Sequence, residues 1–143
     1  INMIRIGNYA LVTMMVIFLI ATHIALVTFS PVLSSKALAD AIRPYLQAGD
    51  VVVINGEYEA GSTLGFYLRR QVRILNGRSS DLWYGSFFND APHLFDDQAS
   101  FWQSWSGPRR IFLWTPLDHV PPLPGRLYII ATSGGKEILS NQP

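Results

Sequence analysis

The first apolar pattern in the chain is a long stretch without a formally charged residue, which runs from Ile6 to Ser35. Its most apolar part, Tyr9 to Phe29, has about the 20 residues that a helix rising about 1.5 Å per residue needs to cross a hydrocarbon layer about 30 Å thick. A helix of a small soluble domain is rarely apolar on all sides, because one side faces water. The pattern therefore predicts a transmembrane helix over residues 6–30.

A secretory signal peptide is the main alternative for this stretch. The apolar region of a signal peptide usually has about 7–15 residues and is followed by a cleavage site between small residues. Here the apolar region is longer, and the A-x-A candidate at Ala39 to Ala41 lies inside a segment with helical spacing. We therefore favour the membrane span.

After the span, helical and strand patterns alternate along the chain. Apolar residues at helical spacing run from Leu38 to Leu46, after Ser34 or Ser35 as a cap, and Pro44 is expected to bend or end this helix. The later patterns predict, in order, a strand at 51–54, a helix capped by Ser62, a strand at 72–75, a helix capped by Asp96 or Asp97, a strand at 111–114, and strands at 127–131 and 137–139.

This alternation of strands and helices is typical of a sheet whose strands are mostly parallel. The SGGK segment at residues 133–136 predicts a tight turn between the last two strands. The fold class that we expect is therefore α/β: one N-terminal transmembrane helix, followed by a small, mostly parallel α/β sandwich domain with a C-terminal β-hairpin. We expect this domain to cover residues 31–143.

Charge and composition say little about the function of the chain. The formal net charge of +1 gives no support to nucleic-acid binding, which is typical of domains with a basic stripe, so we expect no nucleic-acid partner. The lack of cysteine leaves the redox compartment open. Arg5 precedes the span, and because positive residues favour the cytoplasmic side, we expect the domain outside the cytoplasm. The chain opens with Ile1 almost directly into the span, so we expect it to be a piece of a longer protein.

The loop after the strand at 51–54, NGEYEAGS, is the first candidate for a binding site. Ligands of parallel sheets bind beyond the carboxyl ends of the strands, and this loop leads into the N-terminus of a helix. Because Glu57 and Glu59 would repel a phosphate, a sugar or a divalent ion fits better. Such a contact would use Glu57, Tyr58, Glu59 and Ser62. The alternative is a solvated turn whose glutamates face water or pair with arginines.

A second candidate is the aromatic segment SSDLWYGSFFNDAP at residues 79–92. Trp83 and Tyr84 are amphipathic aromatic residues, a kind that is enriched at the level of lipid headgroups. Together with Phe87 and Phe88 they could contact substrate or dock the domain on a membrane-embedded partner. The alternative is that these side chains fill the core of the domain.

The usual catalytic motifs are missing or lie in the wrong context. Ser133 to Lys136 spells S-x-x-K, but the two glycines between them favour a hairpin turn over the helical start that acyl transfer requires. The sequence has no nucleophile elbow, dinucleotide-binding glycine motif or P-loop. His93 and His119 lie far apart, without further ligands at metal spacing. We therefore assign no catalytic residue and no metal site.

Four stretches together resemble a known family: FSPVLSSKALADAI, GDVVVINGEYEAGSTLGFYLRRQVRILNGR, LWYGSFFNDAP and ATSGGKEILSNQP. Through these stretches, residues 30–143 resemble the C-terminal extramembrane domain of bacterial GT-C glycosyltransferases. The types that they resemble are the aminoarabinose transferases and the dolichyl-phosphate-mannose-protein mannosyltransferases. The resemblance implies a parent protein that crosses the membrane many times and transfers a sugar from a polyprenyl phosphate. It implies lipid A modification or protein mannosylation as the reaction, and catalytic acidic residues outside these 143 residues.

The resemblance also implies the partners and the location. The partners would be the lipid bilayer, the remaining transmembrane domain of the parent and, through the parent, the polyprenyl-phosphate sugar and its acceptor. The location would be the bacterial inner membrane, with this domain on the periplasmic side of the cell envelope. We expect no cofactor in this fragment, and a divalent metal, if the family uses one, in the parent. The alternative function is a single-span, membrane-anchored module that binds a glycan or a protein without catalysis.

Overall fold

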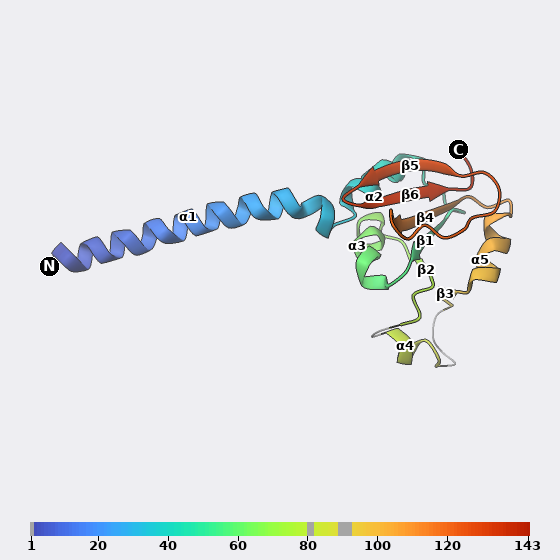
Figure 1. The fold of residues 1–143 in the computed structure, drawn as a ribbon, viewed down its shortest axis with the longest axis horizontal. Helices are drawn as coiled ribbons and strands as arrows, with labels where there is room; N and C mark the ends of the chain where they lie inside the picture. Colours follow the sequence, from blue (N-terminus) through green and yellow to red (C-terminus); the bar gives the residue numbers. More distant parts are fainter. Residues whose placement is uncertain (1, 80–81, 89–92) are drawn as a thin grey trace.

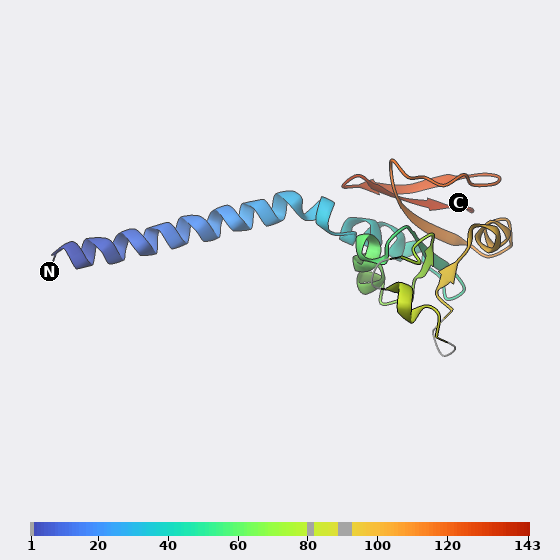
Figure 2. The ribbon, with the colours of Figure 1, turned by 60° about the horizontal axis from the view of Figure 1, so that its bottom comes forward.

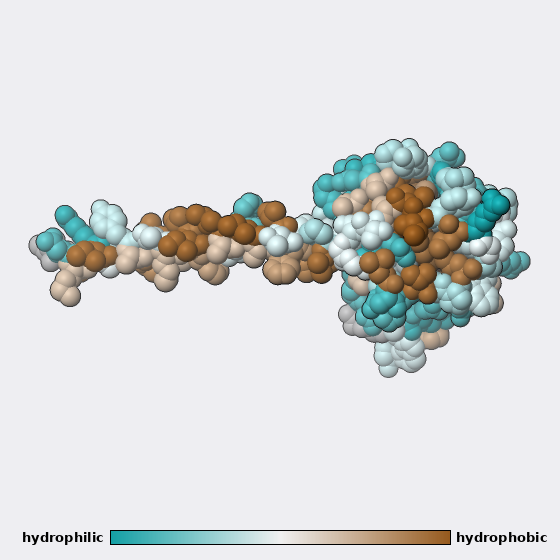
Figure 3. Space-filling view, turned by 45° about the horizontal axis from the view of Figure 1, so that its top comes forward, coloured by the Kyte–Doolittle hydropathy of each residue, from teal (hydrophilic) through white to brown (hydrophobic). Residues whose placement is uncertain are grey.

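The computed structural model describes residues 2–79, 82–88 and 93–143. The first element is the helix α1 (Asn2–Leu33), which projects away from the rest of the chain (Figure 1). Most of its surface is apolar (Figure 3). By length and composition α1 can cross a membrane, and none of its described residues is buried by the domain. A core helix would be covered by its own domain. An apolar helix that stays uncovered needs a lipid environment, so the chain has a membrane location.

In the described part of the chain, six strands form one sheet in the order β3-β2-β1-β4-β6-β5. The first four strands in this order are parallel, β6 pairs antiparallel with β4, and the edge strand β5 pairs antiparallel with β6. This confirms the predicted fold class, a mostly parallel α/β sheet with a C-terminal hairpin. The strands are β1 (Val51–Asn55), β2 (Arg73–Leu75), β3 (Phe95–Asp96), β4 (Ile111–Pro116), β5 (Tyr128–Ser133) and β6 (Lys136–Ser140).

Helices cover both faces of the sheet. On one face, α2 (Lys36–Ile42) and α3 (Tyr58–Leu68) pack their apolar residues against β1, β4 and β6. On the other face, α5 (Gln98–Trp105) packs Phe101 and Trp105 against the same strands. Because β1 and β4 are buried on both faces, their sequences read as continuous apolar runs.

The helix ends show which capping predictions hold. As expected, α2 ends before Pro44, and a short 3-10 turn, η1 (Arg43–Tyr45), follows it. The cap of α5 is Asp97, whose side chain accepts a hydrogen bond of 2.7 Å from the backbone amide of Ser100. The prediction that Ser62 caps a helix is wrong. The helix α3 begins one turn earlier, at Tyr58, and the Ser62 hydroxyl donates within the helix to the carbonyl oxygen of Glu59 at 3.0 Å.

Two short elements are not predicted from the sequence. The strand β3 has two residues, and the helix α4 (Leu82–Gly85) is a single turn in the aromatic segment. The helix α4 and the β5–β6 hairpin lie on opposite sides of the domain (Figure 1, Figure 2).

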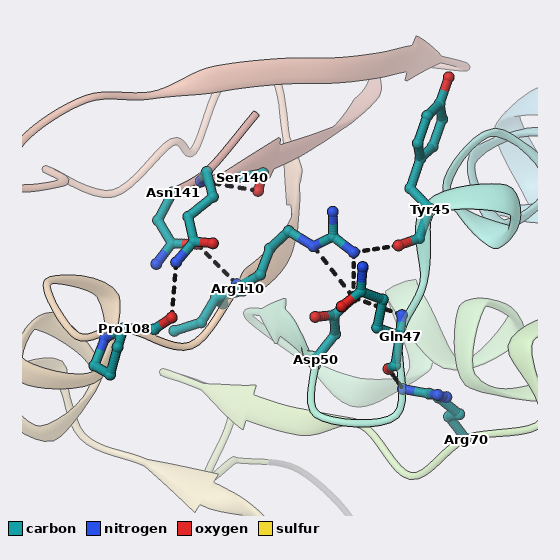
Figure 4. Close-up of polar contacts among 10 residues, drawn as sticks. Tyr45, Gln47, Asp50, Arg70, Pro108, Arg110, Ser140 and Asn141 are labelled. Atoms are coloured by element: carbon teal, nitrogen blue, oxygen red, sulfur yellow. Dashed lines mark hydrogen bonds and ion pairs between the residues drawn. The ribbon is translucent and has the colours of Figure 1, made fainter.

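An ion pair ties the turn before β1 to the start of β4. The guanidinium of Arg110 donates two hydrogen bonds to the Oδ2 atom of Asp50, from Nε at 3.2 Å and from a terminal nitrogen at 2.7 Å. The same guanidinium donates to the carbonyl oxygen of Tyr45 (Figure 4). Because both charged side chains are mostly buried, this contact fixes the amino-terminal edge of the sheet.

The end of α1 is tied to the domain at several points. The backbone amide of Ser35 donates to the Thr63 hydroxyl of α3 at 2.9 Å, and the indole of Trp114 in β4 donates to the Ser35 hydroxyl at 3.0 Å. The β5–β6 turn also touches α1, because the backbone of Gly134 lies directly against the carbonyl group of Pro31. This turn lies at the carboxyl end of β4, next to Pro116, and β1 runs parallel to β4. The carboxyl edge of the parallel strands therefore faces the end of the span.

Candidate functional site

A depression of about 580 Å³ opens at the carboxyl ends of β1 and β4. The strand order changes direction here, because the chain continues from β1 to β2 on one side and later returns to β4 on the other. In open α/β sheets such a switch point is the usual place for a ligand. The residues that line the depression are Asn55, Gly56, Glu57, Ala60, Asn76, Gln98, Pro116, His119, Pro121 and Pro122.

The buried amide of Asn55 organises the floor of the depression. Its Nδ2 atom donates to the Thr115 hydroxyl at 3.1 Å and to the carbonyl oxygen of His119 at 2.8 Å. Its Oδ1 atom accepts a hydrogen bond of 3.1 Å from the Nδ2 atom of Asn76. A single side chain therefore connects the loops that follow β1, β2 and β4, and it holds the amide of Asn76 and the loop of His119 at the rim.

Close backbone packing supports the same floor. The amide of Gly56 donates to the carbonyl oxygen of Leu75 at 2.8 Å, and a Cβ atom at Gly77 would lie 2.1 Å from the carbonyl oxygen of Gly56. Only glycine fits at position 77, because the two loops approach each other this closely.

The rim of the depression carries polar side chains, and one of them, Glu57, is a carboxylate. Glu57 is the N-terminal cap residue of α3 and is exposed at the rim, as is the imidazole of His119. The Nδ1 atom of His119 lies 2.9 Å from the carboxylate of Asp118, and this hydrogen bond lowers the pKa of Asp118. The described residues that line this depression include no lysine or arginine. Amides, a carboxylate and proline rings suit a ligand with neutral hydroxyl groups better than a phosphate.

A smaller polar depression of about 390 Å³ adjoins the first and shares Asn76 and Gln98 with it. It also contacts Asp96, whose carboxylate is paired with the guanidinium of Arg73. Burial raises the pKa of Asp96 above its usual value, against the opposing effect of Arg73. The neighbouring Asp97 is occupied as the cap of α5.

The structure separates the four candidates of the NGEYEAGS loop. Glu57 lines the main depression, whereas Tyr58 and Glu59 lie in the exposed first turn of α3 and are not among its lining residues. Ser62 is half-buried one turn further along the helix, with its hydroxyl bonded to the backbone. Sequence reasoning missed the lining residues Asn76, Gln98 and His119 as site residues, because they come from separate loops.

The aromatic candidates lie on the surface around α4. Trp83 is 46% exposed and Tyr84 79% exposed, and their rings meet edge to face at 5.1 Å between centroids. Phe87 packs on Trp83 at 5.2 Å, and the guanidinium of Arg78 stacks on Phe87 at 5.1 Å. Residues 80–81 and 89–92 of this segment lie outside the described residues. The described aromatic residues form an exposed cluster and do not fill the core.

A wider and shallower depression, of about 890 Å³, lies around the end of α3. It is lined by Arg43, Arg69 and Arg70, and the side chains of Arg43 and Arg70 have partners in the chain. Arg43 pairs with Asp40 at 2.8 Å and donates to the carbonyl oxygen of Tyr67, and Arg70 donates to the carbonyl oxygen of Gln47. The switch-point depression is therefore the better candidate site.

No group of three histidine, aspartate or glutamate side chains in the described residues could hold a metal ion. The sequence-based expectation of no cofactor in this fragment stays a prediction.

Solved structures of ArnT from Cupriavidus metallidurans resemble this chain. The apo structure matches with a TM-score of 0.60 and 22% sequence identity over 78% of this chain. The structure bound to undecaprenyl phosphate matches with a TM-score of 0.58 and 21% identity over 75% of this chain. These matches cover 20% and 19% of the ArnT chains, so this chain spans about a fifth of their length. No protein-family model and no curated protein matches the chain. At this identity the likeness concerns the fold, and at that level it confirms the resemblance predicted from the sequence.

Proposed function

We propose that this chain is the C-terminal part of an integral-membrane glycosyltransferase, which transfers a sugar from a polyprenyl-phosphate donor to a lipid or protein acceptor. The observation that carries the proposal is the combination of a membrane-spanning helix with a domain of the ArnT fold directly after it. One of the ArnT structures is bound to undecaprenyl phosphate, which is a polyprenyl phosphate. The acceptor would be lipid A in an aminoarabinose transferase or a protein in a mannosyltransferase.

In this proposal the fragment itself performs no catalysis. The catalytic carboxylates, and a divalent metal if the reaction uses one, belong to the rest of the parent protein. The domain docks on the remaining transmembrane domain through the exposed aromatic residues around α4, or it helps to bind the acceptor at the switch-point depression. Both roles are supported by the contacts of Ser35 and Gly134, which hold the end of α1 beside the carboxyl edge of the parallel strands. Arg5 before the span favours a periplasmic domain.

The docking role is tested in the native full-length protein. Replacing Trp83 and Tyr84 by serine removes two exposed aromatic side chains and should abolish most sugar transfer in membranes while the protein remains folded. Phe66, which is 75% exposed on α3, provides the matched control, because Phe66→Ser removes a comparable exposed ring from another element. Loss of folding in the double variant alone would support a structural role of the aromatic residues, and full activity of the folded double variant would reject docking through α4.

The parent is tested by the mass of the native protein in membranes. A polytopic protein several times larger than the 16.0 kDa of this chain is expected. A native product of this mass would overturn the transferase proposal in favour of a single-span binding module.

A further inference from the structure

The β5–β6 turn holds a lysine beside the end of α1. Lys136 is nine-tenths buried, and its Nζ atom lies 3.5 Å from the carbonyl oxygen of Ser34. In the same turn, a Cβ atom at Gly134 would lie only 1.9 Å from the carbonyl oxygen of Pro31, so the turn and the helix end are in direct contact. The position of the ammonium group is therefore fixed relative to the span.

This position corresponds to the headgroup layer of a membrane. The continuous apolar run of the span ends at Phe29, exposed Val32 and Leu33 follow in the last turn of α1, and the helical hydrogen bonding continues to Ser34, whose amide donates to the carbonyl oxygen of Ser30 at 2.9 Å. At about 1.5 Å per residue, Ser34 lies roughly 8 Å beyond Phe29. Each headgroup layer is about 5–8 Å thick outside the hydrocarbon core. If α1 spans the membrane, the ammonium of Lys136 therefore lies within the headgroup layer, which contains the lipid phosphates.

The ammonium group has little to bind within the chain. It carries three donors, and its contact with the Ser34 carbonyl is at the outer limit for a hydrogen bond. No carboxylate of the described residues forms an ion pair with it, whereas the nearby Lys36 pairs with Asp40 at 2.6 Å. Burial lowers the pKa of Lys136, and a bound anion would oppose that shift.

We propose that Lys136 binds the phosphate of an anionic lipid at the point where α1 leaves the membrane. Lysine is a common phosphate ligand, and it acts as a point charge without a fixed orientation. The lipid could be a phospholipid such as phosphatidylglycerol or a polyprenyl phosphate, because both present a phosphate at this depth. The proposal requires only that α1 spans the membrane, and it is independent of the proposed sugar transfer.

The test measures lipid binding to the whole chain in a neutral detergent by native mass spectrometry. Dioctanoyl phosphatidylglycerol and a short-chain polyprenyl phosphate are titrated separately, with dioctanoyl phosphatidylcholine as the zwitterionic reference. We expect the unmodified chain to bind one anionic lipid about fivefold more tightly than the reference, which is the effect of one lysine near a charged membrane surface. Lys136→Met, which keeps the length of the side chain, should lose this preference, and Lys136→Arg should keep it. Lys36→Met is the matched control and should keep it, because the charge of Lys36 is already paired.

The outcomes show which lipid is bound and whether Lys136 binds lipid or only caps α1. A preference for both anionic lipids means that the site recognises the phosphate alone. A preference for one of them means that the site also recognises the rest of that lipid. Both results support the proposal. An equal affinity of the unmodified chain for anionic and zwitterionic lipids would overturn it without any variant. An unchanged preference in Lys136→Met would also overturn it and would leave Lys136 as a cap of the α1 carbonyl groups.

Discussion

The indole Nε1 atom of Trp114 donates a hydrogen bond of 3.0 Å to the hydroxyl oxygen of Ser35, and both residues are fully buried. Trp114 belongs to the central strand β4, and Ser35 connects the span to α2. This contact therefore transmits the orientation of the membrane helix to the middle of the sheet. Together with the hydrogen bond from the Ser35 amide to Thr63 and the contact of Gly134 with Pro31, it holds the domain at the end of α1.

Removing one partner of this hydrogen bond should destabilise the domain. Ser35→Ala leaves the buried indole nitrogen without its acceptor, and we expect the free energy of unfolding to fall by about 1–3 kcal/mol. Denaturant unfolding of the whole chain in detergent, followed by near-ultraviolet circular dichroism, measures this change. Ser86→Ala is the control, because the Ser86 hydroxyl donates to a backbone carbonyl at the surface, and its effect should stay within about 0.5 kcal/mol. Equal effects of the two variants would contradict the structural role of Ser35.

The ion pair between Arg110 and Asp50 should matter more than those at the surface (Figure 4). Arg110→Met leaves the carboxylate of Asp50 mostly buried without its partner, and we expect a loss of about 3 kcal/mol in the free energy of unfolding. The exposed pair of Lys36 and Asp40 serves as the comparison, since Lys36→Met should cause no measurable change. The same unfolding experiment measures both variants, and a small effect of Arg110→Met would show that water reaches Asp50.

The fold class could be predicted from the sequence because the decisive segments have strong local patterns. The runs at 51–54 and 111–114 are apolar on both faces, as parallel central strands require, and two glycines mark the β5–β6 turn. The strand β3 has only two residues and therefore no period that a sequence pattern could reveal. The start of α3 was misplaced because serine is a common cap, whereas here Glu57 takes that position without a side-chain cap bond.

The candidate site could be predicted only in part. Glu57 could be predicted as a site residue because it lies in the loop directly after the first strand. The contact of Asn55 with Asn76 and the His119 loop depends on which strands are neighbours in the sheet, and residues 55, 76 and 119 are too far apart in the sequence for a local pattern to join them. A sequence shows that such loops end strands, but the sheet order decides which loops meet.

The cap of α5 gives a pH-dependent prediction. The hydrogen bond from the Ser100 amide lowers the pKa of Asp97 below its ordinary value. Because the folded state binds this proton less readily than the unfolded state, the stabilisation is complete above the unfolded pKa and is lost as the pH falls through the folded pKa. We expect Asp97→Ala to lower the melting temperature by about 4 °C at pH 7 and by less as the pH falls below about 4.

Melting curves of the unmodified chain and the Asp97 variants over a pH series measure this effect. Asp97→Asn is the control, because asparagine also caps a helix and carries no titrating group. The difference between the unmodified chain and Asp97→Ala should shrink at acidic pH, while the difference between Asp97→Asn and Asp97→Ala should stay constant. A difference between the unmodified chain and Asp97→Ala that does not depend on pH would mean that the charge of Asp97 does not contribute.

The two glycines of the β5–β6 turn test whether this turn holds the end of α1. Both have positive φ angles, +58° at Gly134 and +77° at Gly135, so alanine at either position should cost about 1 kcal/mol in backbone strain. Only at Gly134 would the new Cβ atom collide with Pro31, whereas nothing lies within 4 Å of the same atom at Gly135. We therefore expect Gly134→Ala to destabilise the chain by about 2 kcal/mol more than Gly135→Ala and to speed amide hydrogen exchange at Ser35. Unfolding and hydrogen exchange of both variants in detergent provide the measurement. If the variants behave alike, the turn does not clamp the helix end, and the orientation of the carboxyl edge toward the membrane would depend on Ser35 alone.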